Sequence, residues 1–124
     1  MSVNDSAIKL ANEIKNSKEY KDFRKYMKDV KNDKECEKLL KDYREIQIKI
    51  QTHNIKNIAI DKKTINKIES TQRRVSNNKK LSNYLASEQK FTLMMNNINK
   101  ILAQAVEKDY KWWLKGNINK RDVF

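Results

Sequence analysis

The stretch NKKLSNYLASEQKFTLMMNNINKILAQAVEKDYKWWL, residues 78–114, decides the fold of this 124-residue chain. It contains no glycine and no proline, and its apolar residues recur at helical spacing. These residues are Leu81, Tyr84, Leu85, Phe91, Met94, Met95, Ile98, Ile101, Leu102 and Ala105. The stretch predicts a single helix of roughly 54 Å, whereas a compact chain of this length is only about 35 Å across. A helix that extends beyond its own domain needs a neighbour for its apolar face, which favours self-association.

The composition also indicates an all-α protein. Proline is absent and Gly116 is the only glycine, whereas sheets and tight hairpins depend on both residue types. Charged residues make up 35% of the chain and hydrophobic residues 38%, as in helices that bury one stripe and solvate the rest. We therefore predict an antiparallel bundle of about five helices, dimeric, with a long C-terminal helix. One helical domain is expected over residues 1–116, followed by a frayed tail over 117–124.

Polar residues that can cap helices divide the remainder of the chain. The expected caps are, in chain order, Asp5 or Ser6, Ser17, Asn32 or Asp33, and Asp61. The third helix should end between His53 and Lys56, and Ile55–Ile60 is an apolar link without a helical period. The short turn Ser76–Asn78 predicts that the fourth helix and the long helix form an antiparallel hairpin.

The chain is strongly basic, and its charge is uneven. The formal net charge is +12, with +4 on residues 1–62 and +8 on residues 63–124. Such a field attracts RNA, DNA or anionic lipid. However, only five of the 28 basic residues are Arg, and the chain is rich in Asn and Ile, as expected from an AT-rich genome.

Four basic residues flank the turn at Asn77 and form a candidate patch for a nucleic-acid backbone. They are Arg73, Arg74, Lys79 and Lys80. A helix-turn-helix DNA reader is disfavoured, because the following helix is too long and the turn has no glycine. The simplest interpretation of the patch is a solvated run of charges.

No set of residues predicts a catalytic, metal or cofactor site. Cys36 and His53 lie about 25 Å apart along one predicted helix, so they cannot share a metal within the chain, and we expect Cys36 to act as a small buried hydrophobe. Most carboxylates alternate with lysines at helical spacing, and only Glu88 interrupts an apolar face. Phosphate-binding loops and nucleophile motifs are absent from the sequence. We predict a non-enzyme without cofactors.

The sequence also predicts where the protein resides. A single cysteine rules out an intrachain disulfide and suits a reducing compartment. The first residues lack the apolar core of a signal peptide, and no apolar run reaches membrane-spanning length. We therefore expect a cytoplasmic protein without membrane insertion.

Two pairs of adjacent large apolar residues predict an unusually wide apolar face. Neighbouring helix positions point about 100° apart, so Met94-Met95 and Trp112-Trp113 cannot each share one narrow stripe. Met94-Met95 suits a surface that contacts a second subunit as well as the core, and core filling alone is the alternative. Trp112-Trp113 packs within the chain or dimer, or forms an exposed docking patch for a partner. The candidate self-association or core face comprises Phe91, Met94, Met95, Ile98, Ile101, Leu102, Trp112 and Trp113. Glu88 is expected to fix its register.

An ordered set of spacings over roughly residues 5–113 resembles the YlbF/YmcA family of small helical bacterial proteins, especially its YheA-like branch. The segments that carry the resemblance are Ala7, Leu10 and Ile14, then Ser17–Tyr20 and Tyr26, then Tyr43–Gln47, Leu81–Leu85, Ser87–Phe91, Met94-Met95 and Ile98–Ile101. The resemblance implies long antiparallel helices, association into dimers or larger assemblies, and a cytoplasmic non-enzyme from a low-GC Gram-positive bacterium. Better-studied branches assist ribonuclease Y in mRNA maturation and influence competence, sporulation and biofilm formation.

This sequence departs from some of those relatives in its cysteines. Relatives in the ribonuclease Y complex carry cysteines associated with an iron–sulfur cluster, whereas the segment Gly116–Phe124 has none. One thiol per chain cannot supply four cluster ligands in a monomer or dimer. We predict no cluster, and iron with acid-labile sulfide in anaerobically purified protein would contradict this.

The leading hypothesis is a homo-oligomeric, non-enzymatic adaptor that binds protein partners in bacterial mRNA processing or development. The alternative is a direct RNA- or DNA-binding protein that uses the basic patch.

Overall fold

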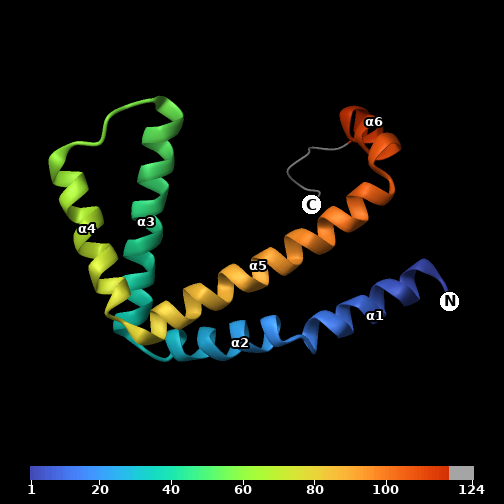
Figure 1. Ribbon diagram of the computed structural model, residues 1–124, viewed down its shortest axis with the longest axis horizontal. Coiled ribbons are helices and arrows are strands. Elements are labelled where there is room, and N and C mark those ends of the chain that lie inside the picture. The colour runs from blue at the N-terminus through green and yellow to red at the C-terminus, as the bar shows by residue number, and fades with distance from the viewer. Residues whose placement is uncertain (118–124) are drawn as a thin grey trace. The chain divides into compact units, whose positions relative to one another are not determined.

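The computed structural model describes residues 1–117, which form six helices and no strand (Figure 1). The helices are α1 (Val3–Lys15), α2 (Lys18–Lys31), α3 (Lys34–Lys56), α4 (Lys62–Ser76), α5 (Lys79–Ala105) and α6 (Glu107–Asn117). The prediction of an all-α protein is confirmed.

Side-chain caps begin each of the helices α1 to α4. Ser17, Asp33 and Asp61 cap α2, α3 and α4, as the sequence predicts, and the Asp61 carboxylate accepts from the Thr64 N–H at 2.8 Å. The predicted cap of α1 is wrong. Ser2 is the cap, and its hydroxyl and the Asp5 carboxylate each accept from the other residue's backbone N–H at 3.1 Å. Asp5 therefore lies inside the first turn.

The long stretch that decides the fold forms two helices instead of one. α5 ends at Ala105, the Val106 N–H donates to the Ala103 carbonyl at 3.2 Å, and α6 begins at Glu107. Val106 is β-branched, and Glu107 and Asp109 favour a new helix N-terminus because they interact with its dipole. The 27 residues of α5 still extend for about 40 Å.

The contacts divide the chain into two compact units, one of residues 1–87 and one that begins at Glu88. α5 continues from the first unit into the second. The single domain over residues 1–116 stays a prediction. Asn117 is the last residue of α6, and the rest of the predicted frayed tail, residues 118–124, lies outside the described residues.

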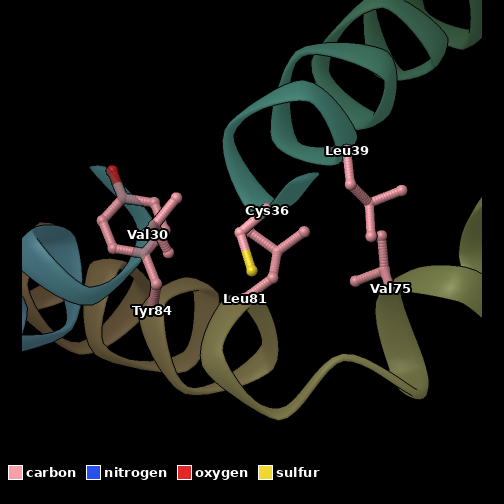
Figure 2. Packing of buried hydrophobic residues seen from close by; sticks show 6 residues of the cluster. All are labelled: Val30, Cys36, Leu39, Val75, Leu81 and Tyr84. Carbon is pink, nitrogen blue, oxygen red and sulfur yellow. The ribbon is translucent and has the colours of Figure 1, made fainter. Parts of the chain in front are cut away.

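The core of the first unit lies where the turn between α2 and α3 meets the turn between α4 and α5 (Figure 1). Four helices contribute to it. Its buried members, shown in Figure 2, are Val30, Cys36, Leu39, Val75, Leu81 and Tyr84. The rings of Phe23 and Tyr84 also stack at 5.7 Å between centroids, which places α2 beside the first turns of α5.

The helices do not pair as the turn Ser76–Asn78 predicts. α4 packs antiparallel to α3, and α5 leaves the turn in another direction (Figure 1). Leu81, in the first turns of α5, is completely buried among residues of α2, α3 and α4. A short turn limits the distance between helix ends but leaves their crossing angle open, so this buried contact determined the direction of α5.

Candidate functional site

An open groove of about 810 Å³ lies in the first unit beside the turn between α4 and α5. We call it the turn groove. Its lining comes from the first turns of α3, the end of α4 and the first residues of α5: Asp33, Glu35, Cys36, Lys38, Leu39, Arg74, Asn77, Asn78, Lys79 and Lys80. The groove therefore carries four basic and two acidic side chains.

A buried thiol and an amide join the two turns beneath the groove. The side chain of Asn78 lies 3.2 to 3.4 Å from Cys36 Sγ, and its Oδ1 accepts from the Leu81 N–H at 3.0 Å. Asn78 therefore caps α5 and contacts α3 at once. Cys36 is only 2% exposed, as expected of a small buried hydrophobe. Burial raises the pKa of the Cys36 thiol, so the thiol stays protonated and is a weak nucleophile.

Two of the four residues in the predicted basic patch pair with carboxylates. Lys80 Nζ lies 3.2 Å from Asp33 Oδ2, and Arg74 lies 3.9 Å from Asp42. Hydrogen bonds from the Cys36 N–H and from Lys80 lower the pKa of Asp33, so its carboxylate remains ionised at neutral pH. Because Lys80 donates this hydrogen bond to the Asp33 carboxylate, the pKa of Lys80 is raised. The electrostatic field of these cations is therefore partly neutralised.

The structure also divides the predicted patch. Arg74, Lys79 and Lys80 line the turn groove, together with Lys38 of α3, which is more than 30 residues away in the sequence and was not predicted. Arg73 lines a separate hollow with Glu69. Helical spacing already separates Arg73 from Arg74 by about 100°. The partners Asp33 and Asp42 have no signal in the local sequence, because they lie more than 30 residues away.

The eight residues of the candidate self-association face lie on two helices. Six are on α5, where Phe91, Met94, Met95 and Ile98 are half-buried, while Ile101 and Leu102 are 66% and 45% exposed. The other two are on α6, where Trp112 is 78% and Trp113 40% exposed. Glu88 is half-buried at the start of the second unit. The break at Val106 means that the two tryptophans do not continue the stripe of α5.

The two side chains that could act as soft metal ligands, Cys36 and His53, lie at opposite ends of α3. Cys36 lies in the first turn of α3, and His53 lies in its last, where its Nδ1 is 2.7 Å from the Lys49 carbonyl oxygen. Among residues 1–117, no three His, Cys, Asp or Glu side chains are grouped as metal ligands would be. No helix in the same residues has the length and hydropathy needed to cross a bilayer.

Comparison with known proteins identifies the family. The family model described as "Control of competence regulator ComK, YlbF/YmcA" matches residues 3–107. This chain belongs to the YlbF/YmcA family. The resemblance noted in the sequence is thereby confirmed, and the family's description is that of a regulatory protein.

Curated relatives agree with the YheA-like branch. A UPF0342 protein of Clostridium novyi is 33% identical over 110 residues, which cover 89% of this chain and 96% of the relative. The UPF0342 protein YheA of Bacillus subtilis is 23% identical over 112 residues, covering 89% and 96% of the two chains.

A solved structure shares the fold. It is described as a protein of unknown function (DUF964) from Bacillus stearothermophilus. Its TM-score to this chain is 0.65 at 19% identity, and the match covers 94% of this chain and 98% of the other. At that identity the likeness supports the helical fold alone.

Proposed function

We propose that this YlbF/YmcA family member is a non-enzymatic adaptor that self-associates through the second half of α5 and binds regulatory protein partners. The family's description, control of a competence regulator, supports a regulatory role. The resemblance to branches that assist ribonuclease Y supports mRNA processing or development as the setting. The cytoplasmic location stays a prediction from the sequence.

The observation that carries this proposal is the apolar surface of α5 within the second unit. Residues 91–99 include no charged side chain, and the exposed Ile101 and Leu102 extend the same region of the helix. Phe91, Met94 and Ile98 recur at spacings of three and four and so share a face with Ile101 and Leu102. A monomer that leaves such a stripe in water is less stable than a dimer that covers it.

The test uses separate variants, each of which introduces one carboxylate on either the apolar stripe of α5 or the other side of the helix. Met95→Asp and Ile98→Asp place a carboxylate on the apolar stripe, whereas Asn96→Asp places the same charge on the opposite, exposed face. We expect the first two variants to weaken self-association at least about tenfold, measured by sedimentation equilibrium, and the control to leave it unchanged. Circular dichroism must show folded helix in all three. Unchanged association and stability in the stripe variants would exclude this face.

The adaptor role needs an identified partner. A tagged protein recovered from its host's lysate should retain ribonuclease Y or related helical subunits after nuclease treatment, as mass spectrometry would show. Loss of every partner on nuclease treatment would favour nucleic-acid binding instead.

Direct nucleic-acid binding is the second candidate, because Lys38, Arg74, Lys79 and Lys80 surround the turn groove. Neutralising Arg73, Arg74, Lys79 and Lys80 together should then weaken RNA binding and flatten its dependence on salt. A variant with Lys9, Lys15, Lys18 and Lys21 neutralised changes the net charge equally and serves as the control. Equal effects in the two variants would mean that only net charge matters.

A further inference from the structure

The α3–α4 hairpin carries exposed isoleucines on the side of α3 that faces away from the core. Ile48 is 62% and Ile55 84% exposed. They are seven residues apart, so they lie within about 20° of one helix face and about 10 Å apart along the axis. The buried Ile46 lies about 160° from Ile48 around the helix, on the face that packs inward. This stripe is therefore additional to the core stripe of α3.

A further exposed isoleucine of the hairpin lies just after the end of α3. Asn57 adopts the left-handed conformation with φ 54°, and the Ile58 N–H donates to the His53 carbonyl at 2.9 Å. This ending fixes Ile58 just beyond the helix, where an apolar residue often packs back on the last turn. Ile58 is still 55% exposed. We call Ile48 and Ile55, which share one face of α3, the hairpin-tip patch.

Lysines border the hairpin-tip patch. Lys49 and Lys56 repeat at the same seven-residue spacing as the isoleucines, about 100° around the helix, and Lys62 and Lys63 follow the link. All four are exposed. Asp61 is the only acidic residue between positions 46 and 65, and its carboxylate caps α4. The border is therefore strongly positive. Figure 1 shows that the ends of α3 and α4 joined by the link lie away from the turns that form the core.

We infer that the hairpin-tip patch docks an amphipathic helix of a partner protein with acidic residues along one flank. An i, i+7 pair of isoleucines matches the apolar stripe of such a helix, and the parallel row of lysines matches its acidic flank. A second copy of this chain would bring lysines against lysines. A nucleic acid has no apolar side chains to cover two aliphatic ones. The inference does not depend on self-association through α5, because it concerns a different helix.

The test uses the full chain and two designed peptides. Each is an alanine-rich amphipathic helix of about 18 residues with one leucine stripe. Glutamates flank the stripe in one peptide, and lysines replace them in the other. Fluorescence anisotropy should show binding of the glutamate peptide and at least about tenfold weaker binding of the lysine peptide. Equal affinities would overturn the inference.

Matched variants separate the patch from the net charge of the chain. Ile55→Ser should weaken binding of the glutamate peptide at least about tenfold without changing the melting temperature, since Ile55 is almost fully exposed. Lys49→Glu with Lys56→Glu should also weaken it, whereas Lys9→Glu with Lys21→Glu, on α1 and α2, should have a much smaller effect. An unchanged affinity in Ile55→Ser, or equal losses in the two charge-reversed variants, would overturn the inference.

Two further measurements test other occupants of the patch. Phosphatidylglycerol vesicles that bind the chain through Ile55 more tightly than the glutamate peptide does would assign the patch to a membrane surface. Self-association lost in Ile55→Ser would assign it to a second copy. Either result would overturn the inference, whereas self-association lost only in Met95→Asp and Ile98→Asp would leave it standing.

Discussion

Asn57 shows how one residue determines where α3 ends. It is the only non-glycine residue with a positive φ among those the structure describes, and a Cβ in this conformation costs about 1–2 kcal/mol unless the side chain compensates, as Asn does. Asn57→Ala should lower the free energy of unfolding by about 1 kcal/mol, measured by urea denaturation. Asn57→Gly tolerates the same φ, so its stability should stay close to that of the native chain. Equal losses in both variants would point to the Asn side chain instead of the backbone.

The aspartate caps make stability depend on pH. Hydrogen bonds from Thr64 lower the pKa of Asp61, and those from Ser2 and Cys36 lower the pKa of Asp5 and Asp33. A folded-state pKa below the unfolded value of about 3.9 means that the stabilisation is complete above that pH and is lost as pH falls through the folded pKa. We therefore expect the free energy of unfolding to fall below about pH 4.

The control for this pH dependence keeps a side-chain cap on α4 but replaces the ionisable carboxylate with a group that does not titrate. Asn at position 61 can cap α4 but does not ionise. Asp61→Asn should therefore reduce the acid-dependent loss of stability, while the stability near neutral pH changes little. Thermal unfolding followed across the pH range measures both. An acid dependence identical to that of the native chain would exclude Asp61 as a contributor.

At the scale of an element, α5 is packed in its first turns and exposed further along its length. Leu81, in its first turn, is completely buried among residues of the other core helices, whereas Leu93 is 61% exposed. Leu81→Ala should cost about 2–4 kcal/mol of unfolding free energy because it removes packed methyl groups and leaves a cavity. Leu93→Ala removes the same atoms from a solvated site and should cost less than about 0.5 kcal/mol. Comparable losses would contradict the burial pattern of α5.

At the scale of the whole molecule, repulsion among positive charges opposes folding. The formal net charge is +12, and the Arg74–Asp42 and Lys80–Asp33 pairs are partly exposed and contribute little. Raising the ionic strength from about 0.01 M to about 0.15 M shortens the Debye length from about 30 Å to about 8 Å. Screening should therefore raise the melting temperature, measured by circular dichroism. A lower melting temperature would mean that the ion pairs stabilise the fold more than the repulsion destabilises it.

The sequence predicted some residues of the candidate surfaces but not others. The apolar positions of α5 follow from helical spacing, and so does the cluster of basic residues near Asn77. The neutralisation of Lys80 by Asp33 was not predictable, since 47 residues separate them. Of the hairpin-tip patch, Ile55 belonged to the apolar link Ile55–Ile60, which has no helical period, and the sequence did not single out Ile48. Their exposure became apparent once the inward face of α3 was known.

The sequence by itself determined α1 to α4, three of the four side-chain caps of those helices, and the family. Helix formation and capping depend on interactions within about four residues, so they can be predicted from the local sequence. Only the tertiary structure decided that α4 packs against α3, that Asn78 contacts Cys36 across 42 residues, and that α5 leaves its turn toward α2. Several amphipathic helices of similar apolar content can pair in more than one way. The choice among pairings depends on which side chains fill the same space, and spacing along the chain does not specify this.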